Sequence, residues 1–371
     1  MTGTVETRDP SRSQDQGRPQ GRNRLRALLI EALVPIIAVV VALLIGLIFI
    51  AITGRDPAKA AEALWVANFG SRRAIGEALV SVTPLIFTGL SVAFAFRAGL
   101  FNIGGEGQYI VAQLAAAVAG YAITGLPGWL HVTVAILAGA LAGGLWGAIP
   151  GLLKAYRGVH EVVNTIMMNY IALYLANYLI ANYLKAPGAL PVTPEILPTA
   201  RLAQILPPSR LHTGLFLALG AAVLVYLLLW HTRWGYEIRA VGHNPRAAEY
   251  AGIDVPRNLA LAMLISGALA GLAGTVQVLG VQRAFYDPVG GFVGYGFDGI
   301  AVALLGRNHP AGVVLAALLF GILDRAAPTM QAMAQVPKAT IWVVQATVIL
   351  LVAADQIIRS LFKRRREVAA R

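Results

Sequence analysis

The sequence contains no cysteine, and only 13% of its 371 residues are charged. Without cysteine the chain forms no disulfide bond and offers no thiolate ligand to a metal ion. Soluble domains carry about 25% charged residues, roughly twice this fraction. Because 57% of the residues are hydrophobic, the chain cannot cover itself with a polar surface, so we expect a lipid bilayer to be its solvent.

The sequence also lacks the short motifs of common catalytic sites. It has no Gly-x-x-x-x-Gly-Lys-Ser/Thr phosphate-binding loop, so ATP hydrolysis would have to come from another chain. It has no Gly-x-Ser-x-Gly elbow, and His160-Glu161 has no second histidine at the zinc-binding spacing. We therefore expect neither an enzyme nor a metal site, and keep a membrane-embedded enzyme as a distant alternative.

Long apolar runs divide the chain into about ten candidate membrane segments of roughly 20 residues each. They are residues 32–53, 78–96, 101–122, 129–152, 161–184, 213–231, 258–280, 290–306, 310–326 and 339–359. Because lipid offers no partner to free backbone groups, runs of this length form helices. We predict an all-α, polytopic transmembrane helical bundle over residues 27–360, in which some segments are broken or re-entrant.

The formal net charge of +12 is better explained by membrane topology than by nucleic-acid binding. Basic residues beside hydrophobic spans follow the positive-inside rule. With the N-terminus in the cytoplasm and ten crossings, 20 of the 30 Lys and Arg residues fall on the cytoplasmic side and 10 outside. This split favours both termini in the cytoplasm. Residues 1–26 are then a disordered cytoplasmic tail and residues 361–371 a basic one.

Two connections between the predicted spans are long. The external one, residues 185–212, contains six prolines and should be ordered or semi-rigid. The internal one, residues 232–257, contains a short helix signature: Asn244 suits the N-cap, Pro245 the first helical position and Gly252 the stop. A helix of about two turns needs a partner surface to be stable. The loop either lies folded on the membrane or docks against another protein.

One apolar segment contains an unexpected group of polar residues. Asn102, Glu106 and Gln108 stand among the glycines of "GLFNIGGEGQ" (99–108). A carboxylate inside a membrane costs about 2.5–3.5 kcal/mol, and irregular backbone is tolerated there only against protein or a water-lined cavity. We predict a broken or re-entrant segment that lines the interior. Alternatively, Glu106 only caps a half-helix or pairs with Arg97.

A similar pair of an acidic residue and a glycine lies in the second half of the chain. Asp298-Gly299 precedes an apolar run much as Glu106-Gly107 does, and by the charge-based topology the two segments run in opposite directions. Paired glycine-interrupted segments of an inverted repeat point to a translocation site at the repeat interface. Chance similarity between spans rich in glycine and alanine is the competing explanation.

The predicted fifth span has one polar and aromatic face. At about 100° per residue, six side chains fall within an arc of about 140°. They are Asn164, Tyr170, Tyr174, Asn177, Tyr178 and Asn182. Such a face suits stacking and hydrogen bonding to a ring-bearing polar solute, or an interface between helices. Asn169 falls off this arc, so we expect a structural role for it.

Several of these stretches resemble one known family. The run from Ala247 to Ile253 resembles the coupling helix of ABC importer permeases, which docks into a cleft on a separate ATPase subunit. Residues 99–108, "GVHEVVNTIMMNYIALYLANYL" (158–179) and "GFDGIAVALLGRNHPAG" (296–312) resemble one branch of it. That branch carries nucleosides and simple sugars and is related to branched-chain amino acid permeases.

The resemblance implies a multi-pass subunit of an ATP-driven importer in the cytoplasmic membrane of a bacterium. It implies no cofactor in this chain, since ATP and Mg²⁺ belong to the partner ATPase. An extracytoplasmic solute-binding lipoprotein and a second permease subunit, a copy or a paralogue, are the other implied partners, with membrane lipid around them and no nucleic acid. Nucleosides are the expected solute, with simple sugars or branched-chain amino acids as alternatives.

Two sets of site residues follow. The residues expected along the substrate pathway are Asn102, Glu106, Gln108, Asn164, Tyr170, Tyr174, Asn177 and Asp298. The residues expected to couple the chain to the ATPase are Asn244, Pro245, Arg246, Ala247, Ala248, Glu249, Tyr250 and Gly252. A proton-driven secondary transporter, with Glu106 and Asp298 as proton carriers, is the alternative from a different functional class.

Overall fold

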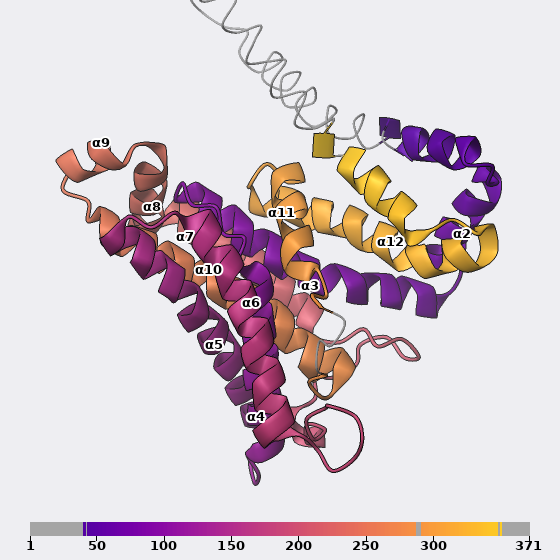
Figure 1. The fold of residues 1–371 in the computed structure, drawn as a ribbon, viewed down its shortest axis with the longest axis horizontal. Helices are drawn as coiled ribbons and strands as arrows, with labels where there is room; N and C mark the ends of the chain where they lie inside the picture. The colour runs from indigo at the N-terminus through magenta and orange to yellow at the C-terminus, as the bar shows by residue number, and fades with distance from the viewer. Residues whose placement is uncertain (1–39, 42, 287–290, 348, 351–371) are drawn as a thin grey trace, which may run out of the picture.

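The computed structural model describes residues 40–41, 43–286, 291–347 and 349–350. The two predicted tails, the first part of segment 32–53 and the last part of segment 339–359 lie outside these residues. In the described part, regular secondary structure is helical, apart from two isolated β-bridges. The prediction of an all-α bundle is therefore confirmed (Figure 1).

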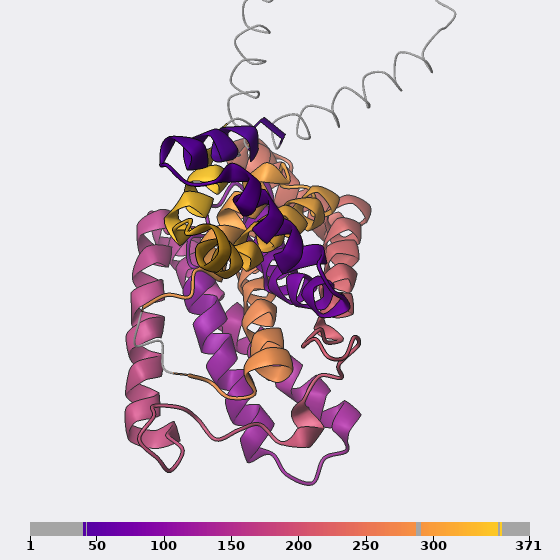
Figure 2. The same ribbon diagram turned by 90° about the vertical axis from the view of Figure 1, so that its right-hand side faces the viewer.

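The described chain opens with helix Leu43–Ile52 and continues with α2 and α3. The side chain of Asp56 caps α2 (Pro57–Phe69), a helix that the sequence patterns did not predict. Its buried alanines pack against α12 (Pro310–Ala334), and Figure 2 shows the two helices together on one side of the molecule. Helix α3 (Arg72–Arg97) is capped by Ser71 and is mostly buried, so it forms the centre of the bundle.

The middle of the chain supplies most of the remaining helices. They are α4 (Gly105–Ala122), α5 (Gly128–Arg157), α6 (Glu161–Leu179) with a π-helical end (Ile180–Leu184), α7 (Gly214–His231), α8 (Arg233–His243) and α9 (Pro245–Tyr250). The last part contains α10 (Val255–Gln277) with a π-helical end (Val278–Gln282), α11 (Tyr295–Leu305), α12 and a helix at 338–347.

The number of predicted crossings is not confirmed. Within the described residues, five helices are long and apolar enough to cross a membrane: α3, α5, α7, Val255–Gln282 and α12. Two predicted spans begin later than expected, because the residues before them are irregular. Helix α4 starts only at Gly105, and α11, with 11 residues, starts at Tyr295. Helix α11 is therefore long enough for a partial crossing only, and α4 lies at the lower limit of a full crossing.

The long central helix of each half of the chain packs against helices of the other half. Helix α3 packs against α11 and α12, whereas α10 packs against α4 and α5, and α3 and α10 also contact each other. A glycine allows each of these close helix contacts. A Cβ atom at Gly89 of α3 would lie 2.6 Å from Cγ1 of Val302 in α11, and one at Gly271 of α10 would lie 3.2 Å from Cβ of Ala112 in α4. The packing of α3 and α10 therefore joins the two halves of the chain.

The loop from 185 to 212 is ordered, as its prolines predict. Its backbone N–H groups donate to carbonyls at the ends of two helices: Ile196 to Arg283 at 2.8 Å, and Leu197 to Gly120, in the last turn of α4, at 2.9 Å. Near the end of the loop, Arg210 forms an ion pair of 2.6 Å with Glu77 of α3. The loop is thus fixed across the ends of α4, α10 and α3.

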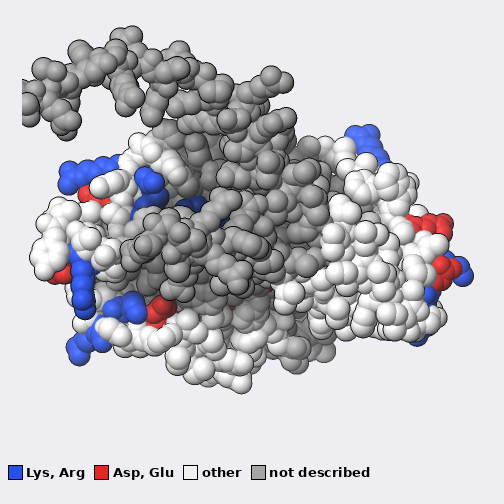
Figure 3. All heavy atoms as spheres, turned by 90° about the horizontal axis from the view of Figure 1, so that it is seen from above, with Lys and Arg blue, Asp and Glu red and all other residues white. Residues whose placement is uncertain are grey.

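Charged side chains are unevenly distributed on the surface. On the face shown in Figure 3, the coloured Lys, Arg, Asp and Glu side chains gather toward the two ends, and the white surface between them is uncharged. Large apolar side chains such as Leu141, Leu145 and Phe216 are more than half exposed on α5 and α7. This surface suits a chain that is surrounded by lipid.

Candidate functional site

Glu106 joins the two halves of the chain. Its side chain is fully buried, and its carboxylate accepts hydrogen bonds from the backbone N–H groups of Gly294 (2.8 Å) and Gly296 (2.6 Å). These N–H groups lie at the N-terminus of α11, where backbone donors lack partners and the helix dipole favours a negative charge. Glu106 therefore caps a half-helix, as one of the two alternatives supposed.

The other alternative, pairing of Glu106 with Arg97, is wrong. The Arg97 guanidinium points elsewhere: its Nε donates to the carbonyl oxygen of Asn308 at 3.0 Å, and it stacks over the ring of Trp230. Among the described residues, the partners of the buried carboxylate are backbone N–H groups, and none is a cation.

Helices α4 and α11 meet at their N-termini. A Cβ atom at Gly296 would lie 2.6 Å from the carbonyl carbon of Gly105, closer than any real contact. Gly294, the residue before α11, has φ +102°, a backbone conformation that favours glycine. The glycines around Glu106 thus allow two helix ends to approach each other, and we call this place the α4–α11 junction (residues 104–106 and 294–298).

Asn102 and Gln108 hold the irregular stretch that leads to the junction. The Asn102 side chain donates to Oε1 of Gln108 (3.0 Å) and to Oγ of Ser266 in α10 (2.8 Å), and it accepts from the N–H of Gly104 (2.9 Å). All of these side chains are buried. The side-chain amides of Asn102 and Gln108 thus hydrogen-bond each other, and Asn102 also hydrogen-bonds α10. In this conformation neither amide is accessible from the surface.

Asn169 of α6 is a further residue at the junction. Its side-chain oxygen accepts from the N–H of Gly107 at 2.7 Å, and its Nδ2 donates to the carbonyl oxygen of Ile103 at 2.9 Å. It therefore bridges α6 to both sides of the break. The structural role that we expected from its place off the polar arc is confirmed.

The polar and aromatic face of α6 points away from the interior of the chain. Tyr170, Tyr174 and Tyr178 are 44%, 66% and 55% exposed. Asn164 and Asn177 are half-buried beside them. A partner chain or a solute would cover this same surface.

One end of this face reaches the α4–α11 junction. The ring of Tyr170 packs edge-on against Phe292 (centroids 5.3 Å apart), and Phe292 packs edge-on against Phe297 of α11 (5.6 Å). Asp298, the next residue of α11, is half-buried. The structure thus brings Tyr170, Glu106 and Asp298 to one region, whereas Tyr174 and Asn177 lie further along α6.

The predicted loop helix is present with the predicted boundaries. The side chain of Asn244 accepts from the N–H of Ala247 at 3.1 Å, Pro245 is the first helical residue, and Gly252 follows with φ +78°. Of the eight predicted coupling residues, only Ala248 is buried, and Tyr250 is 93% exposed. Figure 1 shows α8 and α9 at the upper left edge of the molecule. Helix α8 was not predicted.

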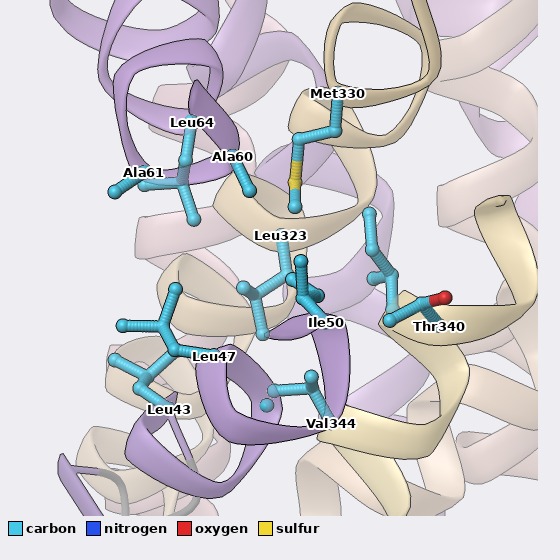
Figure 4. Close-up of a pocket in the computed structure, with 12 residues that line it drawn as sticks. Leu43, Leu47, Ile50, Ala60, Ala61, Leu64, Leu323, Met330, Thr340 and Val344 are labelled. Atoms are coloured by element: carbon cyan, nitrogen blue, oxygen red, sulfur yellow. The ribbon is translucent and has the colours of Figure 1, made fainter. Parts of the chain in front are cut away.

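One apolar pocket lies away from the junction. It has a volume of about 220 Å³ and is formed by helix Leu43–Ile52, α2, α12 and the helix at 338–347. Figure 4 shows that its labelled side chains are apolar, apart from the hydroxyl group of Thr340. Such a lining offers little to a polar solute. Over the described ranges, no cluster of three or more His, Cys, Asp or Glu side chains could hold a metal ion.

Comparison with known proteins agrees with the resemblance of the motifs. Residues 74–353 match the family described as "Branched-chain amino acid transport system / permease component". The chain is 45% identical to the guanosine ABC transporter permease protein NupP of Bacillus subtilis over 84% of its length and 90% of the relative. It is 36% identical to the nucleoside ABC transporter permease protein NupB of Lactococcus lactis, covering 87% and 91% of the two chains.

A third relative, the glucose ABC transporter permease protein of Haloferax volcanii, is 33% identical over 81% of both chains. The match to the family model includes the α4–α11 junction, the face of α6 and the loop with α8 and α9. The chain therefore belongs to the family of permease components of branched-chain amino acid transport systems.

Proposed function

We propose that the chain is the membrane-spanning subunit of an ATP-driven ABC importer, and that its solute is a nucleoside. The observation that carries this proposal is the aromatic cluster of Tyr170, Phe292 and Phe297 beside Asp298 at the α4–α11 junction. Aromatic rings stack on nucleobases, at about 1–3 kcal/mol per base. A carboxylate accepts hydrogen bonds from ribose hydroxyl groups and from base N–H groups.

The exposed face of α6 supports a pathway shared by two subunits. Tyr174 and Tyr178 continue from Tyr170 along the helix and are open to whatever lies beside this chain. A second permease subunit, a copy or a paralogue, would enclose this face, so that Tyr174, Asn164 and Asn177 line the route between the two. The junction then marks the middle of the route, where Glu106 fixes the two helix ends.

ATP hydrolysis and solute delivery belong to other chains in this proposal. The exposed helix α9 docks on an ATPase subunit that holds ATP and Mg²⁺, through Arg246, Glu249 and Tyr250. A solute-binding lipoprotein outside the cytoplasmic membrane of a bacterium delivers the nucleoside. Both termini are cytoplasmic, and the chain itself has no enzymatic activity.

In the proposed cycle, the pathway is open alternately toward the outside and toward the cytoplasm. The nucleoside enters from the outside and stacks against the cluster at the junction. Closure of the ATPase pair moves α9, and the bundle then opens toward the cytoplasm. The glycines at the junction let the two helix ends approach closely, and the carboxylate of Glu106 is the side-chain group that joins them.

A simple sugar is the second candidate solute, because one relative is a glucose permease. The aromatic cluster argues for the nucleoside, since a flat base covers more of the rings than a sugar alone does. The family description, which refers to branched-chain amino acids, adds a third solute to the test.

The experiment compares these solutes directly. The chain is produced with its ATPase and binding protein in cells that lack nucleoside uptake, and entry of labelled guanosine is measured against excess adenosine, glucose or leucine. We expect entry that adenosine blocks and the other two do not. No guanosine entry, or entry that glucose or leucine blocks and adenosine does not, would refute the nucleoside assignment.

A pair of tyrosine variants tests the site. Tyr170→Leu removes one ring of the cluster and should reduce guanosine entry at least fivefold, by loss of a stacking contact of about 1–3 kcal/mol. Tyr156→Leu is the matched control, since Tyr156 is an exposed tyrosine of α5. Equal entry in the two variants would remove Tyr170 from the site.

A further inference from the structure

The segment from Arg97 to Glu106 holds α11 at both of its ends. Beyond the C-terminus of α11, Arg97 donates through Nε to the carbonyl oxygen of Asn308 at 3.0 Å. At the N-terminus of α11, Glu106 accepts from Gly294 and Gly296. A helix of 11 residues is thus tied twice to one short stretch of the other half. Movement of that stretch must move α11.

The turn held by Arg97 has an uncommon backbone conformation. Arg307 and Asn308, which link α11 to α12, have φ of 53° and 52°, the left-handed region that residues with a Cβ rarely adopt. Such residues persist where their surroundings fix them. The hydrogen bond from Arg97 to the Asn308 carbonyl is one such constraint, so α11 and this turn follow Arg97 as a unit.

Helix α8 lies directly against the same segment. A Cβ atom at Gly242 would overlap the carbonyl oxygen of Arg97 and lie 2.9 Å from the carbonyl carbon of Ala98. Gly99, with φ +73°, is also close to Gly242, since a Cβ there would lie 3.2 Å from the Gly242 Cα. Backbone therefore touches backbone, with no side chain between α8 and the turn that begins the irregular stretch.

A second contact joins α8 to the same place. The guanidinium groups of Arg97 and Arg239 both lie over the Trp230 ring, 5.1 Å and 5.9 Å from its centroid. His309, the N-cap residue of α12, is 5.1 Å from the same ring. Trp230, at the end of α7, thus connects α8, the end of α3 and the start of α12.

We propose that α8 controls the α4–α11 junction through Gly242 and Trp230, which act as positioning residues. When α9 is displaced, α8 displaces the turn from Arg97 to Gly99, and α11 moves with it because both of its ends are tied to this stretch. Phe297 and Asp298 at the start of α11 are moved as a result. This inference rests on the proposed function, in which α9 is the segment that the ATPase moves.

The test measures coupling and not activity alone. The complete transporter is reconstituted in liposomes, and ATP hydrolysis and guanosine uptake are measured together for Gly242→Ala and Gly220→Ala. Gly220 is the matched control, because a Cβ there meets nothing within 4 Å. For Gly242→Ala we expect at least a tenfold loss of uptake per ATP hydrolysed, with hydrolysis within twofold of normal. Gly220→Ala should leave the ratio unchanged.

Two variants of Trp230 serve if Gly242→Ala does not fold. Trp230→Phe keeps an aromatic ring beneath both arginines and should retain most of the coupling ratio, whereas Trp230→Leu removes the ring and should lower the ratio as Gly242→Ala does. A purely structural role would lower the amount of folded protein in both without changing the ratio. Unchanged ratios in Gly242→Ala and Trp230→Leu would overturn the proposal.

A labelling measurement separates failure of this inference from failure of the proposed function. Phe297→Cys places a single thiol at the junction, since the chain has no cysteine of its own. Its rate of modification should change at least threefold between ATP-free and ATP-bound transporter, and Gly242→Ala should abolish that change. This readout needs no solute. An ATP response that persists in Gly242→Ala contradicts control by α8, whichever solute is carried.

Discussion

The carboxylate of Glu106 accepts a hydrogen bond of 2.6 Å from the backbone N–H of Gly296, across 190 residues of sequence. This contact explains why an apolar segment contains an acidic residue among glycines. The negative charge lies at the N-terminus of a helix from the other half of the chain, where N–H groups and the helix dipole stabilise it. The same contact fixes the place where the two halves meet.

A methyl group at Gly296 should separate the halves. Gly296→Ala would bring its Cβ to 2.5 Å from the Cα of Glu106, and overpacking of this kind costs about 1–3 kcal/mol or more. We expect a lower melting temperature in detergent and loss of uptake. Gly220→Ala, in open space, should change neither. If Gly296→Ala melts at the same temperature as the wild type, the α4–α11 junction has room for a methyl group and this prediction is wrong.

Two substitutions at Asn169 should have graded effects. Asn169→Asp keeps an oxygen that accepts from Gly107 but loses the donor to Ile103, whereas Asn169→Leu loses both bonds. Each lost bond that leaves a buried partner unpaired costs about 1–3 kcal/mol. The melting temperature should therefore fall in the order wild type, Asp, Leu. If Leu is as stable as the wild type, Asn169 does not hold the break.

The sequence predicted features that depend on neighbouring residues. The boundaries of α9 follow from Asn244, Pro245 and Gly252, which act within a few residues of one another. The break near Glu106 could be inferred because glycines and a charge in an apolar run conflict with a simple span. The expectation that Asn169 is structural came from its position on the helix.

Features that depend on distant contacts were not predicted. The partner of Arg97 is 211 residues away, and no local pattern distinguishes Asn308 from other candidates. Apolar length did not separate α11, with 11 residues, from a full crossing, because the irregular residues before it are apolar as well. Helices α2 and α8 were missed because helices this short are stabilised mainly by the surface against which they pack.

The buried His212 predicts a pH dependence of stability. Burial in the loop of residues 185–212 lowers the pKa of His212 to about 4, and its Nδ1 accepts from the N–H of Gly214. The unfolded chain binds this proton below about pH 6.5 and the folded chain only near pH 4, so stability is lost as the pH falls through this window. The loss approaches about 3 kcal/mol at its lower end.

Thermal unfolding in detergent between pH 7.5 and 4.5 measures this effect. His212→Asn keeps an acceptor for the N–H of Gly214 but removes the group that binds the proton. The variant should therefore flatten the pH dependence, even if the protein is less stable throughout. His243→Asn, at an exposed position of α8, is the control and should keep the wild-type slope. The prediction is wrong if both variants have the same slope.

Single cysteines test the orientation in the membrane. Leu190, in the loop of residues 185–212, is 69% exposed, and Tyr250, in α9, is 93% exposed. In intact cells a membrane-impermeant maleimide should label Leu190→Cys at once and Tyr250→Cys only after permeabilisation. The opposite pattern would place α9 outside, where no ATPase could reach it.

The energy source of uptake in membrane vesicles distinguishes ATP-driven import through the α4–α11 junction from proton-driven transport. Guanosine uptake is measured with ATP alone or with an imposed pH gradient alone, for the unchanged chain and for Glu106→Gln. The amide keeps the size of Glu106 and one acceptor oxygen but cannot carry a proton. We predict uptake with ATP only, reduced but still dependent on ATP in Glu106→Gln. Uptake driven by the gradient alone, and abolished in Glu106→Gln, would contradict the account in favour of a proton-coupled transporter.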